Sequence, residues 1–485
     1  MSSPTRALVL GGGLAGLLAA TALSRHVDEV TVLDRDAADA FGASGASRAS
    51  GAEPGAGPRK GTPQGHHAHL LWSGGARAME SLLPGVTDGW QAAGARRIGV
   101  HQDMVSLTAH GWQHRFPGTQ FMIACSRPLL DAVVREHALA APRIRLRPAT
   151  EVVELLGDAA RVTGALVREL GSDRPERLAA DLVVDATGRG SALPRWLATL
   201  GVPEPATERV DPGIVYATRI FRAPAVLADT FPVVSVYADH RTGEPGRNAV
   251  LLPIEGGRWM VTLSGTRGGE PGAAEEDFDA FTRGLRHPLV AELVAGAEPL
   301  TEVRRTRSTT SRRIFCERAE RWPAGLVVLG DALAALNPVY GHGMSVAARA
   351  AVALDAALAE HGLGAPLTRA AQAAVAACAD DPWIFAAAQD LRYPDVRAEV
   401  TDPRLTTEAA DRARFADLLG ATAIRSPVLS AATTAVSTLS EPATSLEDPA
   451  VLAELRKGPQ RPELVKPPLK ASERDRLAEL VGPAA

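Results

Sequence analysis

Residues 7–34, ALVLGGGLAGLLAATALSRHVDEVTVLD, decide the fold that we expect for this 485-residue chain. The stretch divides into an apolar run (7–10), a G-x-G-x-x-G spacing (Gly11, Gly13, Gly16), a helix-forming segment (14–23) and a β-branched run (30–33). This order predicts a strand, a tight turn, a helix and a second strand, which together form the βαβ unit of a Rossmann-like fold. The alternative is that the glycines only pack a helix against a strand.

Each glycine of the turn has its own predicted role. Gly11 makes the tight turn, Gly13 lets the backbone approach a pyrophosphate, and Gly16 lets the helix pack closely on the strand. Leu14 and Ala15 begin the helix, whose first N–H groups have no partner within the helix and can bind an anion. The turn therefore predicts a phosphate-binding site.

Asp34 ends the second strand about 20 residues beyond the glycines, where a carboxylate can accept both ribose hydroxyls of an adenine dinucleotide. A 2′-phosphate would be repelled at this position. The bound nucleotide is therefore predicted to be FAD or NAD. We place the next residue, Arg35, at the same adenine end of the site.

Composition narrows the class of protein. A hydrophobic content of 46% predicts a large core, built as two to three domains or as one interleaved pair. The net charge of −4 argues against a nucleic-acid partner. Three widely spaced cysteines read as reduced thiols of a cytoplasmic protein. We see no secretion signal, and no charge-free apolar run reaches the ~20 residues that a membrane span requires.

The fold class that we predict is α/β (α+β overall): a Rossmann-like domain interleaved with an antiparallel-sheet domain, followed by C-terminal helices. Alternating and aromatic segments split by Gly and Pro indicate the antiparallel strands. The first domain is assigned residues 1–84, 126–205 and 304–360, and the second domain residues 85–125 and 206–303. Residues 361–485 are assigned to the C-terminal helical region and tail.

Several local expectations accompany this division. We expect residues 37–61, rich in Ala, Gly, Ser and Pro, to be a mobile loop. Residues 70–83 predict a helix, and Pro128 suits the first position of another. The C-terminal helices are expected at 365–380, 405–419 and 448–457, and the Pro-rich tail from residue 458 is expected to be loosely attached.

Three separated motifs resemble the FAD-dependent monooxygenases related to p-hydroxybenzoate hydroxylase: the glycine turn with Asp34, residues 185–188 (DATG), and Gly330-Asp331 before a Gly-rich helix start. The resemblance implies that Asp331 meets the ribityl chain or pyrophosphate of FAD, and that Arg127 points towards the same cofactor. The loop that would present N–H groups to the flavin ring contains Pro338, Gly341, His342, Gly343 and Met344. A helix N-terminus there would stabilise the negative charge of reduced flavin.

A more specific similarity is to the flavin epoxidases of polyether ionophore biosynthesis, which act in the monensin and lasalocid pathways. It implies FAD-dependent epoxidation of E-alkenes in a linear polyene polyketide, free or carrier-protein bound, with NADPH or NADH as electron donor. An epoxide hydrolase would then open the epoxides into cyclic ethers. The segments that carry the similarity are 59–64 (RKGTPQ), 69–75 (HLLWSGG), 111–117 (GWQHRFP), 125–127 (CSR), 264–269 (SGTRGG) and 337–344 (NPVYGHGM).

The same resemblance implies that the oxidant is a C4a-hydroperoxyflavin formed from reduced FAD and O₂. No side chain then has to act as nucleophile or general base, because the cofactor carries the difficult step. His342 is a candidate to influence the reactive oxygen, or else has a structural role in its turn. Many aromatic hydroxylases carry Asp-Gly where this chain has Thr187-Gly188, and that segment is tied to flavin and NADPH contacts.

Other interpretations remain open. Another FAD-dependent hydroxylase, an isoprenoid reductase and a non-enzymatic escort protein share the fold, as does a halogenase, whose Trp-x-Trp-x-Ile-Pro signature is absent (Trp383-Ile384 is the nearest fragment). A metal site is one interpretation of the histidines at positions 66, 67 and 69 (His66, His67, His69). No carboxylate or thiolate lies at ligand spacing from them, so we predict no metal. Strands at 214–221, 233–237 and 259–263 are candidates to line an apolar substrate channel or to belong to the sheet core.

Overall fold

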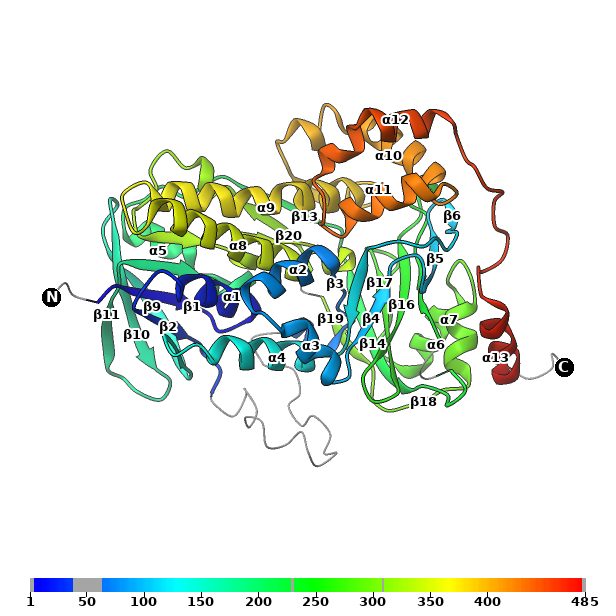
Figure 1. Ribbon diagram of the computed structural model, residues 1–485, viewed down its shortest axis with the longest axis horizontal. Helices are drawn as coiled ribbons and strands as arrows, with labels where there is room; N and C mark the ends of the chain where they lie inside the picture. Colours follow the sequence, from blue (N-terminus) through cyan, green and yellow to red (C-terminus); the bar gives the residue numbers. More distant parts are fainter. Residues whose placement is uncertain (1–3, 38–62, 228–230, 308, 482–485) are drawn as a thin grey trace.

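The computed structural model describes residues 4–37, 63–227, 231–307 and 309–481 (Figure 1). Its first sheet has five strands, all parallel, in the order β21-β12-β1-β2-β8. The predicted Rossmann-like unit is confirmed: β1 and β2 pair in parallel, and the helix α1 connects them in the sequence. These strands are β1 (Arg6–Leu10), β2 (Glu29–Leu33), β8 (Ile144–Arg147), β12 (Leu182–Asp185) and β21 (Leu326–Val328).

Four helices position the site around this sheet: α1 (Leu14–Leu23), α4 (Arg127–Leu139), α8 (Gly343–His361) and α9 (Leu367–Asp390). Almost all of α1 is buried, because its small and apolar residues pack between the sheet and α8. Figure 1 shows α8 and α9 side by side, and the two helices are in extensive contact. The glycine turn is therefore anchored by β1 on one side and by the buried helix α1 on the other.

The second sheet has eight strands drawn from separate parts of the chain. It is antiparallel except for the parallel pair β15–β5. The predicted interleaved architecture is thus confirmed. In spatial order the strands are β18 (Glu298–Pro299), β14 (Val215–Arg222), β17 (Arg258–Gly265), β16 (Arg247–Ile254), β15 (Val233–Val236), β5 (Met104–Thr108) and β6 (Gly111–Trp112), with β19 (Arg304–Thr306) also paired to β14.

One face of the second sheet is filled by α6 (Glu275–Arg283) and α7 (Leu289–Ala295), which close a hydrophobic core. About half of the apolar residues considered for a substrate channel lie in this core. Ala217, Phe221, Val234, Val236, Trp259, Val261 and Leu263 all belong to it. The sheet-core interpretation therefore holds for them, and a channel would have to use the opposite face.

The remaining elements form smaller sheets and connections. β3 (Leu71–Trp72), β7 (Phe121–Ala124) and β4 (Arg96–Gly99) make one three-stranded sheet and β11, β10 and β9 make another. The other bounds are α3 (Val86–Ala92), α5 (Leu193–Thr199), β9 (Thr150–Gly157), β10 (Val162–Glu169), β11 (Pro175–Ala179), β13 (Thr207–Asp211), β20 (Ser311–Ile314), β22 (Ala334–Ala335) and β23 (Arg397–Glu399).

Three expectations about elements need correction. The helix expected at 70–83 starts later, as α2 (Ser73–Leu82), because Leu71 and Trp72 pair with β7 as strand β3. The helix expected at 365–380 runs on to Asp390 through Pro382, since its buried apolar residues continue beyond that proline. Helix α4 begins at Arg127, one residue before Pro128, and Ser126 caps it. The loop expected at 37–61 lies outside the described residues, apart from residue 37.

The C-terminal region holds α10 (Ala409–Ala423), α11 (Pro427–Ser437), α12 (Pro449–Arg456) and α13 (Ala471–Val481). The expectation of a loosely attached tail is wrong. Helix α13 packs on α7, away from α10 to α12, as Figure 1 shows. Glu473 of α13 pairs with Arg115 at 2.5 Å, and both side chains are nearly buried. No helix within the described residues is long and apolar enough to cross a membrane.

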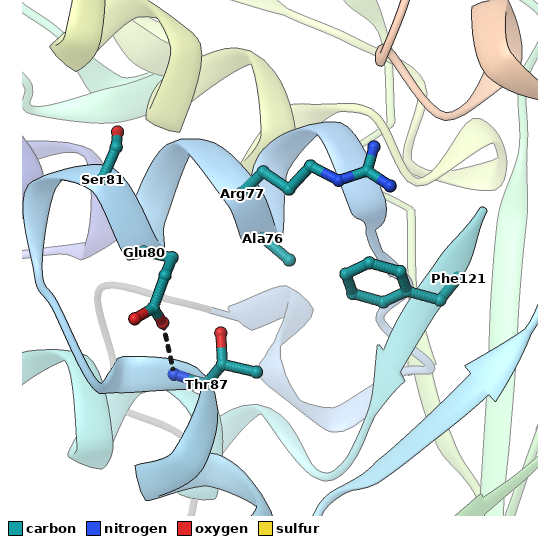
Figure 2. A pocket seen from close by; sticks show the side chains of 6 residues that line it. All are labelled: Ala76, Arg77, Glu80, Ser81, Thr87 and Phe121. Carbon is teal, nitrogen blue, oxygen red and sulfur yellow. Dashed lines mark hydrogen bonds between the residues drawn. The ribbon is translucent and has the colours of Figure 1, made fainter. Parts of the chain in front are cut away.

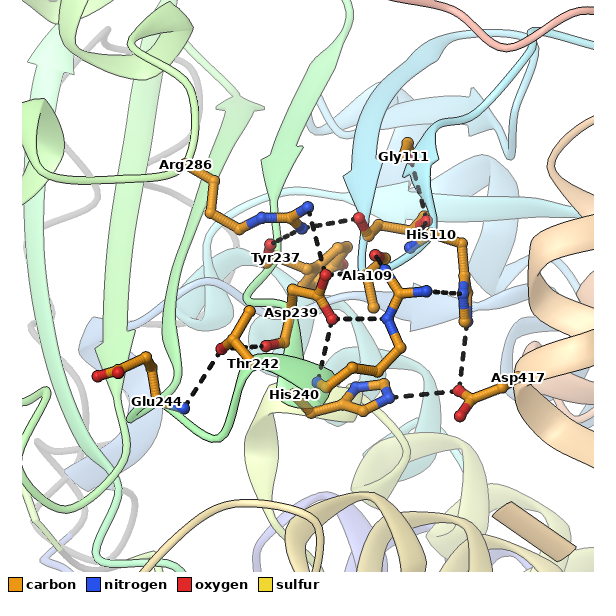
Figure 3. Close-up of polar contacts among 12 residues, drawn as sticks. Ala109, His110, Gly111, Tyr237, Asp239, His240, Thr242, Glu244, Arg286 and Asp417 are labelled. Atoms are coloured by element: carbon orange, nitrogen blue, oxygen red, sulfur yellow. Dashed lines mark hydrogen bonds and ion pairs between the residues drawn. The ribbon is translucent and has the colours of Figure 1, made fainter. Parts of the chain in front are cut away.

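A polar network fastens the C-terminal helices to the second sheet (Figure 3). Asp417 of α10 accepts bonds from Arg392, with Nη1 at 3.0 Å, and lies 3.4 Å from Nε2 of His240. Asp239 accepts Nε of Arg241 at 2.8 Å in the same network. This attachment brings the end of α9 to the edge of the sheet.

Candidate functional site

The three motifs meet at one edge of the parallel sheet. Because β1, β2, β12 and β21 are parallel, the residues that follow their carboxyl ends lie together, and this is where α/β sheets bind ligands. The glycine turn follows β1, Asp34 follows β2, residues 185–188 end β12, and Gly330-Asp331 follow β21. The site is therefore assembled by topology from segments about 300 residues apart in sequence.

The glycine turn has the geometry of a phosphate cradle. Gly11 has φ +102°, and a Cβ there would lie 2.5 Å from the carbonyl oxygen of Ala186. A Cβ on Gly16 would lie 1.8 Å from the carbonyl oxygen of Gly11, so α1 packs on the turn at backbone distance. A Cβ on Gly13, at the N-terminus of α1, would meet nothing within 4 Å. Open space at a helix N-terminus suits a pyrophosphate.

Asp34 is nearly buried beside this turn. Its carboxylate accepts the N–H of Gly12 at 2.7 Å and the N–H of Asp36 at 2.8 Å. A carboxylate accepts hydrogen bonds only, and it is the type of group that binds ribose hydroxyls in dinucleotide sites. Arg35 is exposed next to it. The predicted adenine end of the site is thus sterically and chemically suited to a dinucleotide.

Gly330 brings the second acidic motif to the same place. It has φ +63°, and a Cβ on it would lie 2.8 Å from Cβ of Ala15 in the first turn of α1. Asp331 follows, 3.5 Å from Nε of Arg189. Arg189 also donates to the carbonyl oxygen of Leu336 at 2.5 Å, which ties residues 185–188 to the loop that precedes α8.

Asp185 is buried at the end of β12 and is fully engaged. It accepts the N–H of Thr187 at 3.0 Å, the Thr187 hydroxyl at 2.6 Å and the Ser191 hydroxyl at 2.5 Å. Burial raises its pKa in spite of these bonds. Asp185 therefore shapes the turn that carries Gly188, at φ +77°, rather than facing a ligand.

The loop at residues 338–344 leads directly into helix α8. Asn337 caps a short 3-10 helix (Pro338–Tyr340) by accepting the N–H of Val339 at 3.1 Å, and Gly341 turns the chain with φ +67°. Gly343 begins α8 and Met344 is buried beneath it. The Trp72 indole donates to the carbonyl oxygen of Tyr340 at 3.1 Å. These contacts fix the N-terminus of α8 relative to the rest of the loop.

His342 is buried within this loop. Its Nε2 lies 3.0 Å from the carbonyl oxygen of Ser437, which can only accept, so Nε2 carries the proton. Burial lowers the pKa of His342 to about 4, and the ring is therefore neutral at pH 7. Its Nδ1 has no hydrogen-bond partner in the described part of the chain. The rings of Tyr340 and Phe385 lie 6.4 and 5.4 Å away.

The histidine cluster joins the two sheets. Nδ1 of His67 lies 2.8 Å from the Thr218 hydroxyl of β14, and Nδ1 of His69 lies 2.7 Å from the His67 carbonyl oxygen. Burial lowers the pKa of His67 to about 4. In the described segments no group of three or more His, Cys, Asp or Glu residues could hold a metal ion. The cluster lies on the face of β14 that carries Thr218 and, two residues earlier, Tyr216.

Arg127, which was predicted to bind the cofactor, forms its salt bridge within its own helix. It is buried at the start of α4, and its Nε donates to Asp131 at 2.7 Å, one helical turn along. This pair is an internal salt bridge rather than the surface pair that is common for arginine. Its position near His69 lowers the pKa of that histidine further, after the larger effect of burial.

A surface hollow of about 310 Å³ lies outside this constellation (Figure 2). The Glu80 carboxylate within it accepts the N–H groups of Gly85 at 2.6 Å and Thr87 at 2.9 Å, so it braces the start of α3. None of the residues that line the hollow was a predicted site residue: Ala76, Arg77, Glu80, Ser81, Thr87 and Phe121.

Sequence reasoning missed the polar residues that support the loop from behind. Asp390 is fully buried at the end of α9 and binds Asn337 and Tyr340. Tyr216 of β14 reaches Asn337 from the second sheet, at 3.3 Å. The only available signal was an acidic residue that follows an Ala-rich apolar helical run, and this signal names no partner.

Comparison with known proteins agrees with the geometry. Residues 68–373 match the family model described as FAD binding domain. Protein Rv3254 of Mycobacterium tuberculosis is 31% identical over 410 residues, covering 81% of this chain and 81% of that protein. The flavin-dependent brominase Bmp2 superposes with a TM-score of 0.62 at 14% identity, covering 93% of this chain and 98% of that one.

A second solved structure is OxyS, an anhydrotetracycline hydroxylase from Streptomyces rimosus. It has a TM-score of 0.56 at 19% identity and covers 90% of this chain and 76% of that chain. At these identities both structures show the fold alone. The family match and the edge of the parallel sheet therefore carry the assignment of the cofactor.

Proposed function

The chain belongs to the FAD-binding domain family, and from this premise we propose that it is a flavin-dependent monooxygenase that epoxidises E-alkenes of a linear polyene polyketide. The observation that carries the proposal is the convergence of the glycine turn, Asp34, Asp331 and the loop before α8 on one edge of the parallel sheet. Bound FAD, reduced by NADPH or NADH, would supply the oxygen chemistry.

In this proposal, different residues hold different parts of FAD. Gly11, Gly13 and Gly16, with the first turn of α1, hold the pyrophosphate, and Asp34 holds the adenosine ribose. Asp331 lies between these and the N-terminus of α8, because a Cβ on Gly343 would lie 3.8 Å from its Oδ1. The N–H groups at the start of α8 would favour negative charge on a flavin ring bound there.

The rest of the site has to exclude water and orient the alkene. Neutral, buried His342 and His67 suit this role because they bring no charge next to an apolar substrate. Tyr216 and Thr218 mark the face of β14 that meets the loop. An extended apolar substrate would gain about 25 cal/mol per Å² of surface buried against such a wall.

Support for the epoxidase class comes from the similarity of several segments, one of which has a clear structural task. Residues 69–75 place Trp72 against the loop and Gly74 and Gly75 against the helices behind it. A Cβ on Gly74 would lie 2.2 Å from the Leu439 carbonyl oxygen, and one on Gly75 would lie 2.3 Å from Oγ of Ser345. This segment therefore braces the start of α8.

The deciding experiment is turnover under ¹⁸O₂. Purified protein with FAD and NAD(P)H is incubated with a linear trisubstituted polyene, and the products are analysed by mass spectrometry. One ¹⁸O atom per epoxide is expected. Hydroxylation of simple phenols with no reaction on the polyene would place the chain among the hydroxylases, and double-bond reduction without oxygen would indicate an isoprenoid reductase. A protein that carries no flavin would point to the escort alternative.

Halogenation requires a separate arm, because the brominase has the same fold. Trp383, the nearest fragment of the halogenase signature, is buried and donates through Nε1 to Glu208 at 3.3 Å. It therefore packs α9 against β13 and does not reach the site. Adding bromide and chloride to the assay with an electron-rich aromatic should leave the products free of halogen.

A further inference from the structure

Asp390 is a carboxyl group buried without a cation behind the loop at 338–344. It is the last residue of α9 and is completely inaccessible. Its Oδ1 accepts the Tyr340 hydroxyl at 2.7 Å, and Asn337 Nδ2 lies 2.9 Å from Oδ1 and 3.0 Å from Oδ2. Within the described residues no Lys, Arg or His forms an ion pair with it. An unpaired buried charge is costly, and the groups that stabilise this one belong to the loop that precedes α8.

Asn337 transmits the position of Asp390 to the loop and to the second sheet. While its amide nitrogen donates to Asp390, its Oδ1 accepts the N–H of Val339 at 3.1 Å and the Tyr216 hydroxyl at 3.3 Å. One carboxyl group therefore sets the cap of the 3-10 helix, the side chain of Tyr340 and a contact to β14. Asp390 lies beyond the 68–373 family match, so this support comes from the C-terminal helical region of the chain.

The charge of Asp390 is finely balanced. The donors stabilise the anion, but burial opposes it more strongly and raises the pKa of Asp390 to about 7. The titratable groups nearby are Tyr216 from β14, Tyr340 from the 3-10 helix and Tyr393 just beyond α9, all neutral at pH 7. The nearby cation, Arg392, is paired with Asp417 instead. Among the residues that the structure describes, no other cation therefore compensates the carboxylate.

We propose that Asp390 is a positioning residue that couples proton release to FAD binding. As an anion it accepts every donor from Asn337 and Tyr340 and holds the loop in the geometry that receives the flavin. Protonation of Oδ2 removes its contact with Asn337 Nδ2 and creates an O–H donor that has to find an acceptor in a buried site. This inference rests on the proposed function only in placing the flavin at residues 338–344.

The test measures FAD release from the full-length holoprotein. Flavin fluorescence after dilution gives the dissociation constant from pH 5.5 to 8.5. Wild-type protein should bind FAD about tenfold more tightly at the upper end, as the loss of one hydrogen bond to a charged group implies. Calorimetry in two buffers of different ionisation enthalpy should detect proton release on binding near pH 7.

Variants distinguish this coupling from a structural role. Asp390→Asn should flatten the pH dependence and abolish proton release, whereas Tyr340→Phe, which removes one stabiliser of the anion, should move the midpoint to higher pH. Asp380→Asn is the matched control: it removes a carboxylate of the same helix α9 that binds Arg404 and not the loop, and it should keep the wild-type profile.

The outcomes separate cleanly. An unchanged profile in Asp390→Asn, or a flattened one in Asp380→Asn, overturns the inference. Should Asp390→Asn not fold, an unmoved midpoint in Tyr340→Phe overturns it equally. The readout needs no substrate, so a protein that shows the coupling but oxidises no polyene would refute the proposed function and support this inference.

Discussion

Gly13 and Gly16 lie three residues apart at the start of α1, yet alanine should destabilise the protein to very different extents at the two positions. A Cβ on Gly16 would overlap the Gly11 carbonyl oxygen at 1.8 Å, whereas one on Gly13 has nothing within 4 Å and an ordinary φ of −76°. Gly16→Ala should therefore lower the free energy of unfolding by more than about 2 kcal/mol, because backbone has to move. Gly13→Ala should cost less than about 1 kcal/mol, the range for a changed helix N-cap.

FAD binding should invert this order of severity. Folded Gly13→Ala places a methyl group in the space reserved for the pyrophosphate, so its affinity for FAD should fall at least about tenfold. Denaturant titration of the apoprotein gives the stabilities, and flavin fluorescence gives the affinities. Wild-type FAD affinity in Gly13→Ala would show that the cofactor does not approach this turn.

Helix α13 is an element whose attachment depends on one nearly buried ion pair. Arg115 and Glu473 are 2.5 Å apart with side chains 10% and 8% exposed, so removing either charge leaves the other desolvated. Glu473→Gln should destabilise the protein by about 3 kcal/mol, the low end for a broken buried pair. The low end applies because Arg115 retains the carbonyl oxygens of Gln102 at 2.8 Å and Pro468 at 3.4 Å.

The effect should be confined to the region of α13. Hydrogen exchange should accelerate across residues 469–481, and the double variant Arg115→Met/Glu473→Leu should recover most of the loss, since an apolar pair replaces the ionic one. Glu479→Gln, on the exposed side of the same helix, is the control. Equal losses in Glu479→Gln and Glu473→Gln would mean that the pair contributes nothing special.

Elements were predictable from sequence where the local pattern and the tertiary surroundings agree. Helix α1 has the predicted bounds, because the turn before it and the apolar residues within it specify the same element. Strand β3 was missed because its two residues become a strand only by pairing with β7, about 50 residues away. Helix α13 was missed because a Pro-rich stretch precedes it, and its burial depends on α7.

The candidate site divides in the same way. The glycine turn, Asp34 and Gly330-Asp331 are recognisable because strand ends place them locally, whereas Asp390 reaches the loop only through the path of α9 and the fold of the C-terminal region. Long-range burial of a single carboxylate leaves no periodic trace in a sequence. Such residues have to be read from the structure.

At the scale of the whole molecule, three histidines connect the first domain, the second sheet and the C-terminal helices. His67 connects the first domain to β14, His101 connects the second sheet to Thr434 of α11, and His342 connects the loop to Ser437 at the end of α11. Burial lowers the pKa of each to about 4, from 6.5. Because burial opposes the charged form of all three rings, protonation in acid should weaken the joins between layers.

The sign follows from proton uptake. Below pH 6.5 the unfolded chain binds protons at these histidines and the folded chain does not until about pH 4, so stability falls as the pH falls through this window. Asp390 acts in the opposite sense, because its raised pKa makes the folded chain bind the extra proton between about pH 4 and 7. His69 adds a fourth histidine, because burial lowers its pKa to about 3. Four histidines outweigh one carboxyl group and leave the equivalent of three, since each shift of about two to four units is equivalent to about 3–5 kcal/mol.

We therefore expect the melting temperature to drop between pH 6.5 and 4.5, measured with FAD in fixed excess. His101→Asn should remove about a third of that drop, because asparagine cannot titrate. Asparagine also tolerates the left-handed φ of +65° at this position. His114→Asn is the control, since that ring is exposed at the surface and bonds only to the Pro462 carbonyl oxygen. An identical drop in His101→Asn and wild type would mean that acid loosens the layers through other groups.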